Sequence, residues 1–119
     1  MKLSMSLRIL LFLFIACLPV WAMASDEEIN HLLNYIEQSG CQFDRNGSVH
    51  DSKEARSHIE MKYDYAKKWI GTTEEFIEYT ATKSSISGKL YYVICDGQRI
   101  PSGEWLNQEL LRYRALAKP

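Results

Sequence analysis

The sequence has little of what marks most enzymes, metal proteins and nucleic-acid-binding proteins. Its 119 residues include only three cysteines, three prolines and three histidines, and the formal net charge is −1. It contains no CxxC pair, HExxH motif, nucleophile elbow or phosphate-binding loop. It also lacks the excess of basic residues that nucleic acids and anionic membranes attract. We therefore expect no cofactor, no metal and no nucleic-acid partner, and an enzyme is the less favoured class.

The longest apolar run stands at the start of the chain and is short. Ile9–Val20 carries no charge and follows two basic residues. It falls below the roughly 20 apolar residues that span a bilayer. Ala22-Met23-Ala24 then provides the small side chains that signal peptidase requires. We expect residues 1–24 to be a cleaved signal peptide. Residues 25–119 would form a single small domain, periplasmic or secreted, with no membrane-spanning segment.

Two other fates of this leader stay open. Phe14-Ile15-Ala16-Cys17 loosely resembles a lipoprotein cleavage site, at which Cys17 would be lipidated instead of removed. An uncut leader would act as a membrane anchor. Both are disfavoured because the apolar segment is short and Ala24 offers a better cleavage site. Removal of Lys2 and Arg8 with the leader leaves 12 basic and 15 acidic residues, a formal charge of −3.

Cys41 and Cys95 are the two cysteines that follow the leader. An even pair in an oxidising compartment is most simply one disulfide, here closing a loop of about 54 residues. The alternative is a redox or metal-binding pair of thiols. It has no support, since no histidine stands at ligand spacing from either cysteine.

Helical spacing of apolar residues dominates the rest of the chain. Three capping boxes predict helix starts, because the first side chain accepts from a backbone N–H that has no partner within the helix. They are Ser25–Glu28, Asp51–Glu54 and Thr72–Glu75. A fourth helix is expected after Pro101-Ser102, with Leu106, Leu110 and Tyr113 facing inward.

Two short regions have the composition of strands. Leu90–Cys95 is rich in Tyr, Val and Ile, and Asp96-Gly97 suits a hairpin turn into Gln98–Ile100. Cys41–Phe43 is a shorter candidate, followed by a predicted turn at residues 44–47. These elements predict an α+β fold of about four helices and a small antiparallel sheet. One disulfide would join the first helix–strand unit to the hairpin.

A series of ordered motifs gives the chain a family likeness. They are Phe43-x-Arg45-Asn46-Gly47-x-x-His50, Glu54-Ala55-x-x-His58-Ile59-x-x-Lys62, Glu75-Phe76-Ile77, Ser84-Ser85-x-Ser87-Gly88-Lys89-x-Tyr91 and Glu104-Trp105-Leu106. The chain resembles the YfeK-like proteins, small exported bacterial proteins of unknown function, from about residue 26 to its end. One departure is Leu90, where proline is expected to be common among relatives. The resemblance implies an exported soluble domain and carries over no catalytic or binding residues.

The polar residues that point to a binding site are Arg45, Asn46, His50, His58 and Lys62. His58 and Lys62 share a helix face, since they stand four residues apart, and the others precede the same helix. Its N-terminus would also favour negative charge. We predict that Arg45, His50, His58 and Lys62 converge on one patch near the start of this helix and bind an anionic group.

The alternative for these residues is structural. Arg45 would bind a carbonyl in an Asn46-Gly47 turn, and His58 and Lys62 would flank the core, with the Lys62 stem beside Tyr65 and Trp69 of the same stripe. A zinc site at His50, Glu54 and His58 is disfavoured because His50 precedes the helix.

A polar loop contributes two further candidate binding residues, Ser84 and Ser85. Residues 87–91 also fit the short SGxxY pattern of some periplasmic lysozyme inhibitors, which resemble β-barrels, whereas this chain reads as mostly helical. Two function classes therefore remain. One is a non-enzymatic module that binds a small anionic ligand or an envelope protein. The other is an inhibitor of an envelope hydrolase such as lysozyme, acting through the loop from Ser84 to Tyr91.

The mature protein is predicted to begin at Ser25, because Ala22 and Ala24 place small side chains at the two positions that signal peptidase reads. N-terminal sequencing of the exported product checks this. A blocked, lipidated N-terminus at Cys17 would contradict the prediction.

Overall fold

A computed structural model describes residues 25–117 of this protein; the predicted signal peptide lies outside the described residues. The elements in chain order are α2 (Asp26–Gln38), β1 (Gln42–Arg45), β2 (Ser48–His50), α3 (Ser52–Ala66), the 3₁₀ turn η1 (Lys67–Trp69), α4 (Thr73–Ile77), the π-helical turn η2 (Glu78–Thr82), β3 (Tyr92–Cys95), β4 (Gln98–Pro101) and α5 (Ser102–Ala117). The predicted α+β class is confirmed. Across residues 25–117, no helix has both the length and the apolar content needed to cross a membrane.

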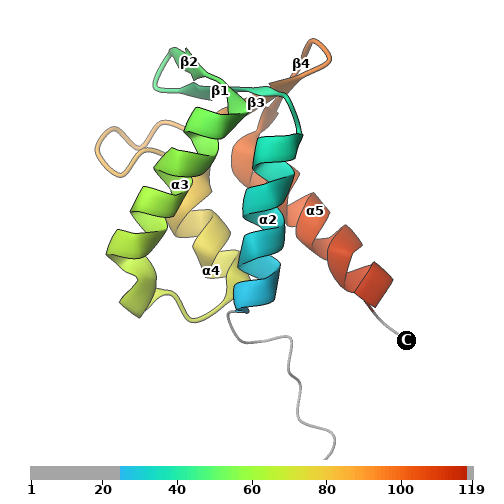
Figure 1. The fold of residues 1–119 in the computed structure, drawn as a ribbon. Helices are drawn as coiled ribbons and strands as arrows, with labels where there is room; N and C mark the ends of the chain where they lie inside the picture. Colours follow the sequence, from blue (N-terminus) through green and yellow to red (C-terminus); the bar gives the residue numbers. More distant parts are fainter. Residues whose placement is uncertain (1–24, 118–119) are drawn as a thin grey trace, which may run out of the picture.

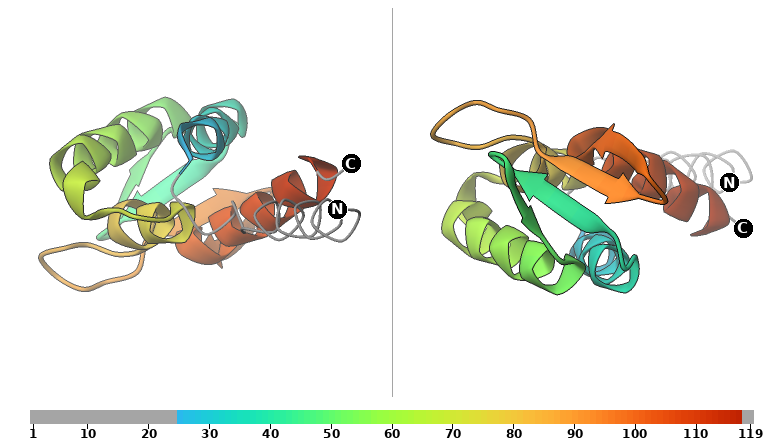
Figure 2. Two further views of the ribbon diagram at one scale, coloured as in Figure 1. Left: turned by 90° about the horizontal axis from the view of Figure 1, so that it is seen from below. Right: turned by 90° about the horizontal axis from the view of Figure 1, so that it is seen from above.

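The four strands form one antiparallel sheet in the order β2-β1-β3-β4. The sheet lies at one end of the helices (Figures 1 and 2). Asp96-Gly97 makes the predicted hairpin turn, and both of its residues have positive φ. That backbone conformation matches the twist of the two strands it joins.

The predicted turn over residues 44–47 is wrong in extent. Asp44 and Arg45 belong to β1, and only Asn46-Gly47 turns the chain, again with positive φ at both residues. The strand that follows, Ser48–His50, was not predicted. It has three residues and no buried side chain, so it carries no apolar alternation, and its pairing with β1 is what makes it a strand.

All three predicted capping boxes begin helices. Ser25 Oγ accepts a hydrogen bond from the Glu28 amide at 3.3 Å, and the Asp51 and Thr72 side chains accept from the amides three residues on, at 2.8 and 3.1 Å. Each bond satisfies a backbone N–H that has no partner within the helix. These caps fix where α2, α3 and α4 start.

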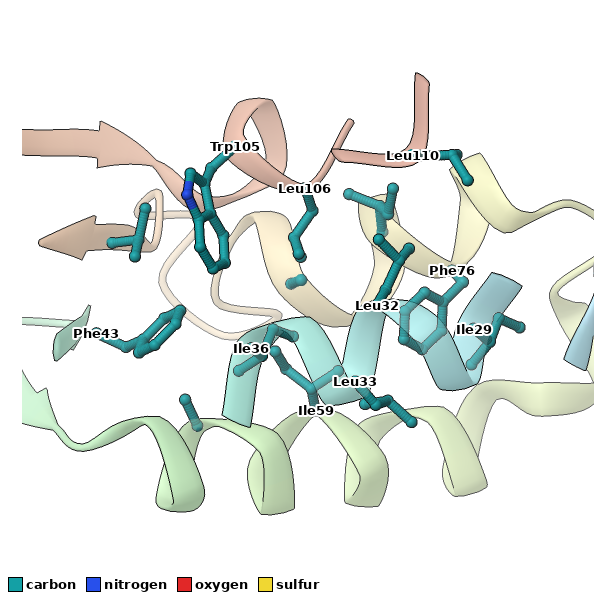
Figure 3. Packing of buried hydrophobic residues seen from close by; sticks show 14 residues of the cluster. Ile29, Leu32, Leu33, Ile36, Phe43, Ile59, Phe76, Trp105, Leu106 and Leu110 are labelled. Atoms are coloured by element: carbon teal, nitrogen blue, oxygen red, sulfur yellow. The ribbon is translucent and has the colours of Figure 1, made fainter. Parts of the chain in front are cut away.

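The core lies between α2, α3, α4, α5 and the inner face of the sheet (Figure 3). The α2 stripe is buried throughout; it consists of Ile29, Leu32, Leu33 and Ile36. Leu106 and Leu110 face inward as predicted, and Trp105 joins them. Tyr113 is only half-buried: it stacks on His31 with ring centres 4.0 Å apart, and its hydroxyl donates to Glu27.

The predicted disulfide between Cys41 and Cys95 is present, with the two Cα atoms 4.9 Å apart. Cys41 directly precedes β1, and Cys95 ends β3. These two strands are neighbours in the sheet, so the bond ties the α2–β1 unit to the C-terminal hairpin.

Replacing both cysteines by alanine should lower the free energy of unfolding by about 4 kcal/mol, because the bond removes loop-closure entropy from the unfolded chain. Urea denaturation of the oxidised protein and the double variant measures this. Thiol labelling of the unreduced protein should find neither cysteine free. Equal stabilities of the two proteins would contradict the prediction.

Candidate functional site

Four basic side chains gather around the ring of Tyr91, which is 8% exposed. We call Arg45, His50, His58 and Lys62 the basic cluster. The His58 and Tyr91 ring centres are 6.0 Å apart, and Lys62 Nζ lies 5.1 Å from the centre of the Tyr91 ring. Arg45 Nη2 lies 3.3 Å from His50 Nε2. The residues predicted to converge do come together.

The sheet register brings the two parts of the cluster together. Asp44 of β1 pairs with Tyr92 of β3, so the next residue of β1, Arg45, lies beside Tyr91. His50 ends β2, and α3 begins at Ser52 after the Asp51 cap. The first turns of α3 therefore rise directly from the end of the sheet.

His50 connects the cluster to a carboxylate. Its Nδ1 lies 2.9 Å from Glu54 Oε2, while its Nε2 faces the Arg45 guanidinium. In the described part of the chain, none of the eight ion pairs uses Arg45 or Lys62.

The Lys62 ammonium donates to two oxygens, the Lys83 carbonyl at 3.2 Å and the Tyr91 hydroxyl at 3.4 Å. Burial, and then the charge of Arg45, lower the pKa of Lys62. The alternative interpretation, in which the Lys62 stem packs beside Tyr65 and Trp69, is wrong. Those aromatic side chains are 82% and 60% exposed and contact each other.

His58 has a buried ring nitrogen, Nε2, for which residues 25–117 supply no hydrogen-bond partner. The ring borders a cavity of about 20 Å³, also lined by Arg45, His50 and Tyr91, which is room for about one water molecule. Burial, and then the charges of Arg45, Lys62 and His50, lower the pKa of His58 to about 4. His58 is therefore neutral at pH 7.

The other three predicted site residues build the neighbouring loop. Asn46 Oδ1 accepts from the Ser87 hydroxyl at 2.7 Å. Ser84 Oγ accepts from the amides of Ile86 and Ser87, and its side chain is buried. Ser85 is exposed. Asn46 and Ser84 thus hold the loop in shape beside the cluster, and the Ser84 side chain also bonds with the Tyr91 hydroxyl.

Tyr91 is the residue of this site that sequence reasoning missed. The sequence places Tyr91 in a strand and in the SGxxY pattern, but not in the anion site, yet its ring is the surface on which His58 and Lys62 pack. The sequence signal that could have found Tyr91 is an aromatic residue directly before β3, three residues after Gly88. Nothing local to Tyr91 shows that α3 covers it.

The arrangement offers hydrogen-bond donors that carry positive charge. Arg45 and Lys62 each use only part of their donor capacity on protein atoms. Within residues 25–117, no group of three His, Cys, Asp or Glu side chains is placed to hold a metal ion. Such a set of donors suits a carboxylate, a sulfate or a phosphate group.

Comparison with known proteins gives one family and one relative. The profile of a family of unknown function, DUF5329, matches residues 23–114. The uncharacterized protein YfeK of Salmonella typhimurium is 41% identical over 78 residues, which are 62% of this chain and 65% of that protein. The match therefore spans less than two thirds of the relative's length, and it confirms the YfeK-like resemblance. No solved structure matches the chain significantly.

The lowered pKa of His58 predicts a specific loss of stability in acid. In the unfolded chain a histidine takes up its proton near pH 6.5, whereas folded His58 does so near pH 4. Between these values only the unfolded chain is protonated, so stability falls as the pH is lowered, by at most about 1.4 kcal/mol per unit.

Urea denaturation from pH 7 to pH 4 measures this effect in the wild type and in His58→Gln. The free energy of unfolding of the variant should fall less over that range, because glutamine takes up no proton in the unfolded chain. Carboxylates with lowered pKa values titrate in both proteins, so the difference isolates His58. Parallel curves would contradict the assignment.

Proposed function

The chain belongs to DUF5329, a family of unknown function, and we propose that this protein is an exported, non-enzymatic module whose basic cluster binds an anionic group. The group would belong to a small ligand or to an envelope protein. Export is proposed from the leader, whose charged start, short apolar run and small residues before Ser25 are those of a signal peptide.

One observation carries the proposal: Arg45 and Lys62 stand beside the unpaired Nε2 atom of His58, and neither forms an ion pair with the described residues. Like charges brought together and partly desolvated cost free energy. The pKa values of His58 and Lys62 are lowered for this reason, because burial and then the neighbouring positive charges disfavour their protonated forms. An anion bound here would offset it, so binding would be favoured both by new hydrogen bonds and by relief of repulsion.

The donors also have the geometry of a binding site. Arg45 comes from the sheet and Lys62 from the second half of the α3 sequence, while Tyr91 provides a flat apolar floor between them. A guanidinium recognises planar and tetrahedral oxyanions through paired N–H groups, and an ammonium adds a point charge. A small ligand with one carboxylate, sulfate or phosphate group would satisfy both.

The hydrolase-inhibitor alternative rests on the loop before Tyr91. That loop projects from the body of the protein, and the Ile86 side chain at its tip is fully exposed. The tyrosine of the SGxxY pattern, however, is buried beneath Lys62 and is not available to a partner. This burial favours the binding module over the inhibitor.

Sulfate is the probe for the test, since its charge is constant between pH 4 and pH 7. Burial is the largest cause of the lowered pKa of His58, and the charges of Arg45 and Lys62 add to it. Sulfate bound between these two cations should raise the pKa of His58 above about 4, because it offsets their part of the shift. The His58 ring resonances, followed by NMR against pH with and without sulfate, report this directly. The rise in the pKa of His58 should reach a plateau as the sulfate concentration increases. It should become smaller as sodium chloride is added, because salt screens the attraction between sulfate and the cluster.

Lys62→Gln should weaken sulfate binding about tenfold, the usual cost of removing a charged hydrogen-bond donor. Lys53→Gln is the matched control, since Lys53 is exposed on the same helix, outside the cluster. This change should leave the sulfate-induced rise in the pKa of His58 as it is in the wild type. A His58 pKa that does not respond to sulfate would refute anion binding. Lysozyme inhibition without that response would favour the inhibitor instead.

A further inference from the structure

A second feature of the surface is a groove of about 450 Å³ between η2 and the start of α5. Leu90 and Pro101 give it apolar walls, and carboxylates stand on its rim. Glu74 is paired with Arg114 at 2.8 Å. Glu78 and Glu104 are exposed, and no ion pair among the described residues uses them.

The floor of this groove is closed by a tight helix contact. A Cβ atom at Gly103 would lie 2.6 Å from Thr82 Oγ1, so glycine is what lets α5 begin this close to η2. The Thr82 hydroxyl in turn donates to the Ile77 carbonyl at 2.9 Å. The groove is thus a fixed feature of the packing between η2 and α5.

Next to the groove stands the loop over residues 83–90, which we call the finger loop. It is held by its own hydrogen bonds: the Ser84 amide donates to the Lys89 carbonyl, and the Gly88 amide donates to the Ser84 carbonyl. Lys83 and Leu90 pair across its base. Figure 2 shows the finger loop projecting from the body of the protein.

The finger loop carries an unusual side chain for an exposed tip. Ile86 is 100% exposed, while the flanking Lys83 and Lys89 are exposed and form no ion pair with the described residues. An apolar side chain presented by an ordered loop loses little conformational entropy when a partner buries it. The finger loop is therefore preorganised for insertion into an apolar site with an acidic rim.

The groove matches this description on the same molecule. It has apolar walls where the finger loop has an apolar tip, and two uncompensated carboxylates where the finger loop has two uncompensated ammonium groups. Leu90 belongs both to the base of the finger loop and to the groove wall, so the two features share one surface. A self-complementary surface of this kind is what a two-fold dimer requires.

We propose that a second copy of this chain fills the groove. In the two-fold dimer each chain inserts Ile86 against Leu90 and Pro101 of the other. Lys83 and Lys89 then approach the carboxylates of Glu78 and Glu104. The charges that this contact uses lie outside the basic cluster, although the Lys62 ammonium joins that cluster to the base of the finger loop.

Sedimentation of residues 25–119 over a range of protein concentrations tests the proposal. The wild type should dimerise, and Ile86→Asp should raise the dissociation constant at least about tenfold, because it removes the buried apolar side chain. Leu116→Asp is the control: Leu116 is also exposed but lies near the end of α5, away from the groove, and its change should have no effect. Both side chains are exposed, so circular dichroism should show folded proteins.

Charge reversal tests the contact itself. The double variants Lys83→Glu/Lys89→Glu and Glu78→Lys/Glu104→Lys should each dimerise poorly alone, since each sets like charges against one another. Mixed together, they should form a heterodimer with opposite charges at both contacts. A wild type that stays monomeric at every concentration would overturn the proposal and leave the groove to another partner. A dimer that Ile86→Asp does not weaken, or a mixture that does not associate, would also overturn it.

Discussion

The pairing of β1 with β3 is the contact on which the rest of the structure depends. Each belongs to a separate hairpin, and a two-stranded hairpin alone is marginally stable in water. Joined through the Cys41–Cys95 bond, they form one sheet against which α3 and α5 pack. The same pairing sets Arg45 beside Tyr91, so the register that stabilises the fold also assembles the basic cluster.

Local chemistry decided what could be predicted from the sequence. The three capping boxes, the inward positions of Leu106 and Leu110 and the Asp96-Gly97 turn depend on residues within a few positions of one another, and all of them are found in the structure. The disulfide followed from an even cysteine count. The shared face of His58 and Lys62 followed from helical spacing alone.

What could not be predicted depends on long-range packing. The strand Ser48–His50 exists because β1 lies beside it, and its own residues show no pattern. Tyr91 becomes the floor of the site only because α3 folds over it, from about 30 residues away in the chain. Likewise Tyr65 and Trp69 share the helical spacing of Lys62 but face solvent, since no element within residues 25–117 covers them.

The position of Lys62 has a consequence for the protein as a whole. A single ammonium group holds the carbonyl of Lys83 at the base of the finger loop and also stands in the basic cluster. The two regions therefore share one ammonium group. If an anion drew this ammonium away, the loop would lose an anchor, and if the loop held it more firmly, the anion would bind less well. Thermodynamic linkage makes these two effects equal in free energy, so the order of the loop reports on the occupancy of the cluster.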